Sequence, residues 1–216
     1  MGMKQIFLLG SSNVYGVGGV QGGWADLVKQ ALHKKMFTPG GIGEKYEIFN
    51  FGKSGVDVDF VIRTFPQLLK IYGRGIPTIA IVSVGGNNAK AQDRPDNFVC
   101  TVEEYALQMT TLIGMLKKVS NHVIIVDGAG YYDESKTNPK INPFIGGASY
   151  FTNKRKILFA TKLKEVCTRE NVPYVEVNIP EKEWVEHYLY EDGLHPNQKG
   201  YELIASKVLA EIEKLL

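Results

Sequence analysis

An acid and a histidine lie three residues apart near the C-terminal end of the chain, within residues 191–201. Gly193 marks a turn between them, and Pro196 closes that turn. A carboxylate this close can accept a hydrogen bond from the imidazole Nδ1–H and leave Nε2 as a base. Asp192 and His195 therefore make up two members of a nucleophilic triad, and the third should be a serine elsewhere in the chain.

Short apolar runs recur along the chain and end in small or polar residues: 5–10, 46–52, 78–85, 122–128 and 173–178. The runs at 79–84 and 123–126 are continuous and rich in β-branched residues, which is typical of strands buried on both faces of a parallel sheet. Apolar residues at helical spacing occur between and after these runs, within 24–32, 60–72, 102–116, 157–167 and 203–212. This alternation predicts an α/β fold of βαβ units, with helices on both faces of a parallel sheet.

Polar, glycine-bearing segments follow the first three predicted strands, at residues 10–13, 50–55 and 85–88. The Asp192–His195 turn comes after the fifth strand, just before the last helix. Ligands of open parallel sheets bind beyond the carboxyl ends of the strands. We therefore expect these four loops to converge at one edge of the sheet.

A serine hydrolase needs a nucleophile, a base, an orienting acid and an oxyanion hole. Ser12 lies directly after the first strand, where a tight turn can expose its hydroxyl, and is our candidate nucleophile. His195 is then the general base, and Asp192 fixes its tautomer. The candidate oxyanion donors are the backbone amides of Ser12 and Gly55 and the side-chain amide of Asn87.

In these loop residues the chain resembles the SGNH hydrolases, also called the GDSL esterase/lipase superfamily. Its four sequence blocks correspond here to Gly10-Ser11-Ser12-Asn13, Asn50-x-Gly52-x-x-Gly55, Gly85-Gly86-Asn87-Asn88 and Asp192-Gly193-Leu194-His195-Pro196. The resemblance implies a three-layer α/β/α fold of flavodoxin-like type with a five-stranded parallel sheet. It also implies no metal and hydrolysis of esters through an acyl-enzyme.

Two residues depart from the family pattern. Ser11 stands where the family usually has Asp before the nucleophile, and Asn88 stands where it usually has Asp after the block-three asparagine. Neither position carries a role in the expected chemistry, so the departures bear on the substrate rather than on the reaction type. Ser54 is the rival serine, but it lacks the G-x-S-x-G nucleophile elbow of the α/β-hydrolases.

A long polar segment, 131–153, follows the fourth predicted strand and should hang over the same edge. Its aromatic residues favour an ordered wall of a substrate pocket, and Tyr131 and Tyr132 are our candidates for that wall; a surface loop anchored by its aromatics is the alternative.

Length, composition and charge limit which classes of protein the chain can belong to. The 216 residues, 44% of them hydrophobic, fit a single domain over 1–216. A net charge of +2 argues against a nucleic-acid surface, and no apolar run reaches the length of a membrane helix. With no secretory signal visible, and with Cys100 and Cys167 far apart, we expect a cytoplasmic protein with idle thiols.

No cofactor is expected. The glycines of 16–23 fit neither the Walker pattern nor the dinucleotide fingerprint, and His187 lacks ligands at metal-binding spacing. The sequence leaves open whether the chain forms homo-oligomers.

We therefore expect a serine esterase acting on a small-molecule ester, of esterase or lipase type. A carbohydrate O-deacetylase or a thioesterase on the same site is an alternative within the class. A non-catalytic binding module and a flavodoxin-like nucleotide or flavin binder are alternatives outside it.

Overall fold

The computed structural model describes residues 2–127, 130–142 and 146–215. A five-stranded parallel sheet forms its centre, in the strand order β10-β7-β5-β1-β4. The strands are β1 (Lys4–Gly10), β4 (Tyr46–Gly52), β5 (Thr78–Ser83), β7 (His122–Val126) and β10 (Tyr174–Val175). The predicted α/β class and five-stranded parallel sheet are confirmed. The fourth run is described as a strand to Val126, and Gly128 at its expected end lies outside the described residues.

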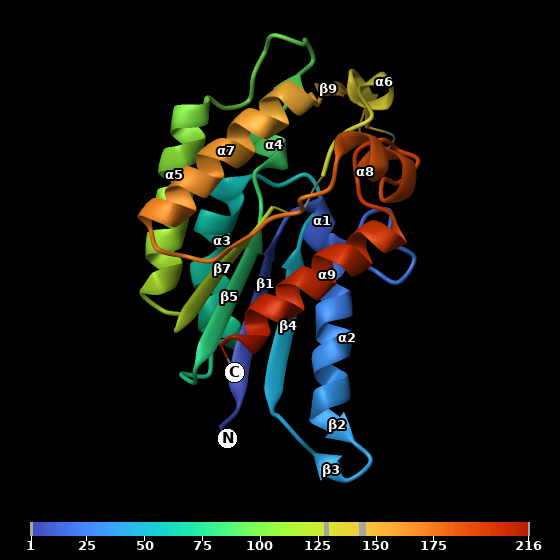
Figure 1. Ribbon diagram of the computed structural model, residues 1–216. Helices are drawn as coiled ribbons and strands as arrows, with labels where there is room; N and C mark the ends of the chain where they lie inside the picture. The colour runs from blue at the N-terminus through green and yellow to red at the C-terminus, as the bar shows by residue number, and fades with distance from the viewer. Residues whose placement is uncertain (1, 128–129, 143–145, 216) are drawn as a thin grey trace.

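Helices cover both faces of the sheet (Figure 1). On one face pack α3 (Val58–Tyr72), α5 (Val102–Lys117) and α7 (Asn153–Arg169), and on the other α2 (Trp24–Met36), α8 (Glu181–His187) and α9 (Gln198–Glu213). Successive residues of β1 alternate between the two apolar cores, Ile6 and Leu8 facing one and Phe7 and Leu9 the other. β1 pairs with both β4 and β5. The strand that leads to Ser12 is therefore buried on every side.

Polar side chains fix where α3, α5, α7 and α9 begin. Asp57, Thr101, Thr152 and Asn197 each accept a hydrogen bond from a first-turn amide of the helix that follows. Such caps satisfy backbone donors that have no partner inside the helix. They also fix the ends of the loops that precede the helices, including the turn that carries His195.

Several short elements were not predicted. They are α1 (Ser12–Tyr15), β2 (Phe37–Thr38), β3 (Gly41–Ile42), α4 (Gly86–Ala89), β6 (Ala91–Gln92), α6 (Glu134–Thr137), β8 (Lys140–Ile141), β9 (Ala148–Tyr150) and α8 (Glu181–His187). The segment predicted as one long loop thus contains a short helix and two strands, and β6-β9-β8 form a small antiparallel sheet. Residues 143–145 of this segment lie outside the described part of the chain.

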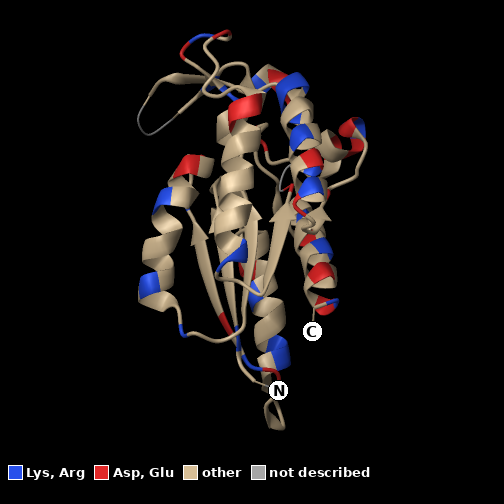
Figure 2. Cartoon of the chain, turned by 90° about the vertical axis from the view of Figure 1, so that its left-hand side faces the viewer, with Lys and Arg blue, Asp and Glu red and all other residues tan. Residues whose placement is uncertain are grey.

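Charged side chains of both signs are interspersed along the helices, whereas the strands carry few of them (Figure 2). Within the described residues, no helix combines the length and the apolar character needed to cross a bilayer.

Candidate active site

Ser12 is the first residue of the four-residue helix α1, which follows β1 directly. At the end of β1, Gly10 has φ 152°, and a Cβ there would lie 2.0 Å from the Ser83 carbonyl oxygen. The Ser11 amide donates to the same oxygen at 3.2 Å. The chain therefore turns sharply against the end of β5, and Ser12 is presented at the carboxyl edge of the sheet.

The second block supports α1 from the side. The Asn50 side chain donates to the Val14 carbonyl oxygen at 3.1 Å and to the Asp26 carboxylate at 2.9 Å. A Cβ on Gly52 would lie 2.3 Å from the Tyr15 amide nitrogen. These two residues of β4 hold the helix that begins with Ser12, a role that sequence reasoning did not assign to them.

The Asp192–His195 turn is closed by local hydrogen bonds. The Tyr190 amide donates to the His195 carbonyl oxygen, and the Gly193 amide donates to the Tyr190 carbonyl oxygen, at 2.8 and 3.0 Å. Gly193 has φ 77°, a left-handed conformation that favours glycine. Asn197 caps α9 and also donates to the carbonyl oxygen of Leu189, so it ties the turn to the last helix.

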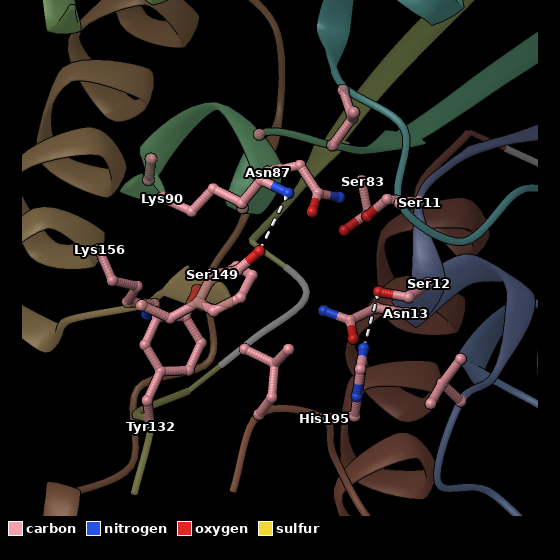
Figure 3. A pocket seen from close by; sticks show the side chains of 18 of the residues that line it. Ser11, Ser12, Asn13, Ser83, Asn87, Lys90, Tyr132, Ser149, Lys156 and His195 are labelled. Carbon is pink, nitrogen blue, oxygen red and sulfur yellow. Dashed lines mark hydrogen bonds between the residues drawn. The ribbon is translucent and has the colours of Figure 1, made fainter. Parts of the chain in front are cut away.

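The acid, the base and the serine lie in one hydrogen-bonded row. His195 Nδ1 is 2.7 Å from Asp192 Oδ2. His195 Nε2 is 2.9 Å from Ser12 Oγ, a contact marked in Figure 3. With the proton on Nδ1, Nε2 accepts from the Ser12 hydroxyl. The side chains of Asp192 and His195 are 18% and 11% exposed, so little water competes for these bonds.

The Asp192 carboxylate is stabilised by several donors. Burial by itself raises the pKa of this carboxyl, but hydrogen bonds from the His195 ring and from the His195 and Leu194 amides outweigh burial and hold the pKa below its ordinary value. The group is therefore an anion at neutral pH, as an orienting acid has to be.

The candidate oxyanion donors surround the same space. Ser12, Gly55 and Asn87 all line the cavity described below. The Ser12 amide lies in the first turn of α1, where backbone donors have no intrahelical acceptor. The Asn87 side chain donates to the Val56 carbonyl oxygen at 2.9 Å, which fixes the amide group and leaves its second N–H as a further donor.

Gly55 is a candidate oxyanion donor because, without a Cβ, its backbone amide can come close to a bound substrate. The structure leaves the space around a Cβ open, with no heavy atom within 4 Å, and the residue has φ 83°. The left-handed backbone, not crowding, is the reason for glycine at this position.

Asn88 is 1% exposed and connects the third block to the helices α3 and α5. Its side-chain oxygen accepts from the Val58 amide at 3.2 Å, and its nitrogen donates to the Gln108 side chain at 2.9 Å. A neutral amide both accepts and donates, so it satisfies this pair of neighbours without burying a charge. The amide that stands in place of the family's usual acid thus links α4 to α3 and α5. Ser11 is 7% exposed, directly precedes α1 and donates its backbone amide to the Ser83 carbonyl oxygen.

A cavity of about 550 Å³ opens in front of Ser12 and His195. It extends past Asn87 and beneath the small sheet to the apolar side chains of Tyr105, Phe159 and Leu163. Lys90, Lys140 and Lys156 also line it. Figure 3 shows Tyr132, Ser149 and the two lysines Lys90 and Lys156 across the cavity from Ser12.

The two tyrosines predicted for the pocket wall differ in position. Tyr132 lines the cavity and is held by Asn153, which accepts from its amide and donates to its carbonyl oxygen at 2.8 and 3.0 Å. Tyr131 is not among the lining residues, and the Lys156 ammonium lies 5.5 Å from the centre of its ring. Since alternate residues of an extended chain point in opposite directions, only one of the two neighbours reaches the cavity.

Sequence reasoning missed the lysines of the cavity. Lys90 lies two residues after the third block, but nothing in the sequence shows that its side chain faces the site, and nothing places Lys140 and Lys156 near the four blocks. Sequence reasoning also missed Ser149, which comes from β9. Across the described ranges, no three His, Cys, Asp or Glu side chains are grouped so as to hold a metal ion.

Most of the chain matches a known protein family. Residues 8–203 match the GDSL-like lipase/acylhydrolase family. An isoamyl acetate-hydrolyzing esterase of Saccharomyces cerevisiae is 24% identical over 174 residues, which are 78% of this chain and 70% of that protein.

Solved structures share the fold at low sequence identity. A lipase/acylhydrolase from Enterococcus faecalis superimposes with a TM-score of 0.71 at 21% identity, covering 99% of this chain and 97% of that one. An acetylxylan esterase from Geobacillus stearothermophilus has a TM-score of 0.65 at 19% identity, covering 97% and 93%. The SGNH-type fold inferred from the four sequence blocks is thereby confirmed.

Proposed function

Since the chain belongs to the GDSL-like lipase/acylhydrolase family of esterase-type hydrolases, we propose that it cleaves a carboxylic ester through an acyl-enzyme formed on Ser12. One observation carries this proposal. His195 bridges Ser12 Oγ and Asp192 Oδ2 with hydrogen bonds of 2.9 and 2.7 Å. A serine in such a row can lose its proton to the imidazole as it attacks.

In the first half-reaction, Ser12 Oγ attacks the ester carbonyl carbon while His195 Nε2 takes the hydroxyl proton. Asp192 stabilises the imidazolium that forms. The negative charge on the former carbonyl oxygen is stabilised by the amides of Ser12 and Gly55 and by the Asn87 side chain. The tetrahedral intermediate then expels the alcohol, which takes the proton from His195.

In the second half-reaction, water attacks the acyl-enzyme and loses a proton to His195 Nε2. The same donors stabilise the second tetrahedral intermediate, and its collapse releases the carboxylic acid and restores the Ser12 hydroxyl. The cavity supplies room for both halves of the ester.

Two relatives point to the first substrates to try. One is named for isoamyl acetate and another for acetylxylan, and both names describe acetate esters. A panel of p-nitrophenyl esters of increasing acyl length, acetylated sugars and an acyl thioester therefore separates an esterase from a carbohydrate O-deacetylase and a thioesterase.

A fluorophosphonate probe tests the nucleophile. The wild-type protein should be labelled on Ser12, the Ser12→Ala variant should not be labelled, and Ser54→Ala should still be labelled. Circular dichroism checks that each variant is folded. A folded wild-type protein that takes no label and hydrolyses none of the panel would overturn the proposed function.

Two expectations from the sequence stay predictions. A single domain over 1–216 should give one cooperative unfolding transition in calorimetry. The cytoplasmic location is tested by fractionation of cells of the source organism.

A further inference from the structure

The cavity in front of Ser12 contains more positive than negative side chains. Among the described residues that line it are three lysines, Lys90, Lys140 and Lys156, and two aspartates, Asp127 and Asp192. The balance of charge inside the cavity therefore depends on how these groups are paired.

Two of the lysines are paired with an aspartate. Lys156 Nζ lies 3.4 Å from Asp127 Oδ2. Lys140 Nζ lies 3.6 Å from Asp192 Oδ2 and 2.6 Å from the carbonyl oxygen of the same residue. Each aspartate of the cavity thus has its own lysine.

Lys90 forms no ion pair within 4.0 Å with any carboxylate in the part of the chain that the structure describes. Its ammonium is 3.4 Å from Ser149 Oγ, and the Ser149 hydroxyl in turn donates to the Gln92 side chain at 3.0 Å. An ammonium has three N–H donors, and this single contact is long. Lys90 can therefore donate further hydrogen bonds to a stronger acceptor.

The charges of Asp93 and Asp57 act on Lys90, and both acids already accept other hydrogen bonds. Asp57 caps α3 by accepting from the Phe60 amide at 2.9 Å, and Asp93 accepts from the Gln92 side chain at 3.0 Å. Burial lowers the pKa of Lys90, against the opposite effect of these two acids. The ammonium is therefore partly stripped of water without a direct counter-ion.

Lys90 lies close to the proposed reacting centre. It follows α4 directly and comes three residues after Asn87. Figure 3 shows its side chain extending into the cavity, with the ammonium between Asn87 and Ser149. A group bound there lies beside the proposed oxyanion donors, within reach of one end of an ester held at Ser12.

We propose that the substrate is an ester with an anionic group, such as a carboxylate, and that Lys90 binds this group. This inference rests on the proposed esterase function and adds the substrate class to it. A charge-assisted hydrogen bond in a half-buried site is stronger than one between neutral groups, so Lys90 selects the anionic substrate. The Ser149 hydroxyl, which donates to the Gln92 side chain, accepts from the ammonium and orients it for this contact.

Two matched pairs of esters test the proposal and show which half of the substrate carries the charge. Mono-4-nitrophenyl glutarate and 4-nitrophenyl pentanoate differ by a carboxylate in the acyl half. 4-Acetoxybenzoate and 4-acetoxybenzamide differ by a carboxylate in the alcohol half. All rates are corrected with the Ser12→Ala protein, which accounts for spontaneous hydrolysis.

We expect the wild-type enzyme to prefer the anionic ester of at least one pair. Lys90→Met, which keeps the length of the side chain, should lower kcat/KM for that ester by about 10- to 100-fold and for its neutral partner by less than about threefold. Lys90→Arg should retain the preference. Lys118→Met, on the exposed end of α5, is the matched control and should change neither rate.

Equal rates within both pairs, or an equal loss for both esters in Lys90→Met, would overturn the inference while leaving the esterase function intact. Direct binding separates the two proposals further. Isothermal titration of the Ser12→Ala protein with glutarate and with 4-hydroxybenzoate should detect binding of at least one anion, and that binding should be lost when Lys90→Met is added. Absence of anion binding would count against Lys90 even if the protein hydrolysed no ester at all.

Discussion

The ammonium of Lys140 donates a 2.6 Å hydrogen bond to the carbonyl oxygen of Asp192 and lies 3.6 Å from its carboxylate oxygen Oδ2. Lys140 belongs to β8, and Asp192 belongs to the turn before α9. A cation at this distance favours the ionised carboxylate and fixes the turn that carries it. The small antiparallel sheet is thus coupled to the proposed orienting acid.

Replacing Lys140 tests that coupling. Lys140→Met should lower kcat by about 3- to 30-fold with little effect on KM for a neutral ester, because the turn loses a charge-assisted hydrogen bond. Steady-state kinetics of a neutral acetate ester measure this effect. Lys164→Met removes a surface ion pair with Glu176 and serves as the control. An unchanged kcat in Lys140→Met would show that the contact has no part in orienting His195.

Asp192→Asn should leave the fold intact and lower kcat by about 10²–10⁴-fold, since an amide no longer holds the His195 ring with its proton on Nδ1. The measurement is kcat in the variant and the wild-type protein near neutral pH. Fluorophosphonate labelling should slow by a similar factor. Labelling at the wild-type rate would show that the Ser12 hydroxyl is activated without Asp192.

The same carboxylate makes stability depend on pH. Its folded-state pKa lies below the ordinary value, so its contribution to stability is complete above about pH 4, the unfolded pKa, and is lost as pH falls through the lower folded pKa. The free energies of unfolding of wild type and Asp192→Asn should therefore converge as the pH is lowered below about 4. Urea unfolding at a series of pH values measures this difference. A difference in unfolding free energy between the two proteins that stayed constant into strong acid would contradict the prediction.

Asn87→Ala removes one proposed oxyanion donor. We expect kcat to fall by about 10²–10³-fold with a small change in KM, because the donor acts on charge that develops only in the transition state. The wild-type melting temperature should be nearly retained, and this is measured alongside the kinetics. A rise in KM without a fall in kcat would assign Asn87 to substrate binding instead.

Both cysteines should be inert in the folded protein. Cys100 and Cys167 are buried, and burial raises the pKa of both thiols, that of Cys167 to about 12. Because the thiolate is the reactive form, iodoacetamide at mildly alkaline pH should modify neither residue and leave hydrolysis unchanged. Mass spectrometry should find both residues alkylated in guanidinium chloride. Inactivation by alkylation of the native protein would contradict a serine nucleophile.

The sheet was predictable because buried parallel strands are continuous apolar runs, and each of the five runs becomes a strand of the central sheet. The position of Ser12 opposite His195 was also predictable, because both follow strands whose carboxyl ends lie at one edge. Patterns of this kind depend on local sequence and on the general geometry of parallel sheets.

The wall of the cavity was not predictable in the same way. Lys90 lies between α4 and β6, and Ser149 belongs to β9; these elements have only two to four residues, too few for hydrophobic periodicity to reveal them. Their contact depends on the pairing of β6 with β9, which are more than 50 residues apart in the chain. The sequence does not show which of two adjacent tyrosines faces inward, and Tyr132 rather than Tyr131 lines the cavity.

The hydrogen bond between Ser12 and His195 joins positions 183 apart in the chain, whereas Asp192 and His195 are only 3 apart. The pairing of acid and base closes a short loop and needs little order beyond the turn itself. The contact with the serine exists only when the first strand, the turn and the last helix are all in place. Ester hydrolysis would then require that both ends of the chain are folded against each other. A peptide that contained only the turn would keep Asp192 and His195 but would lack the Ser12 hydroxyl.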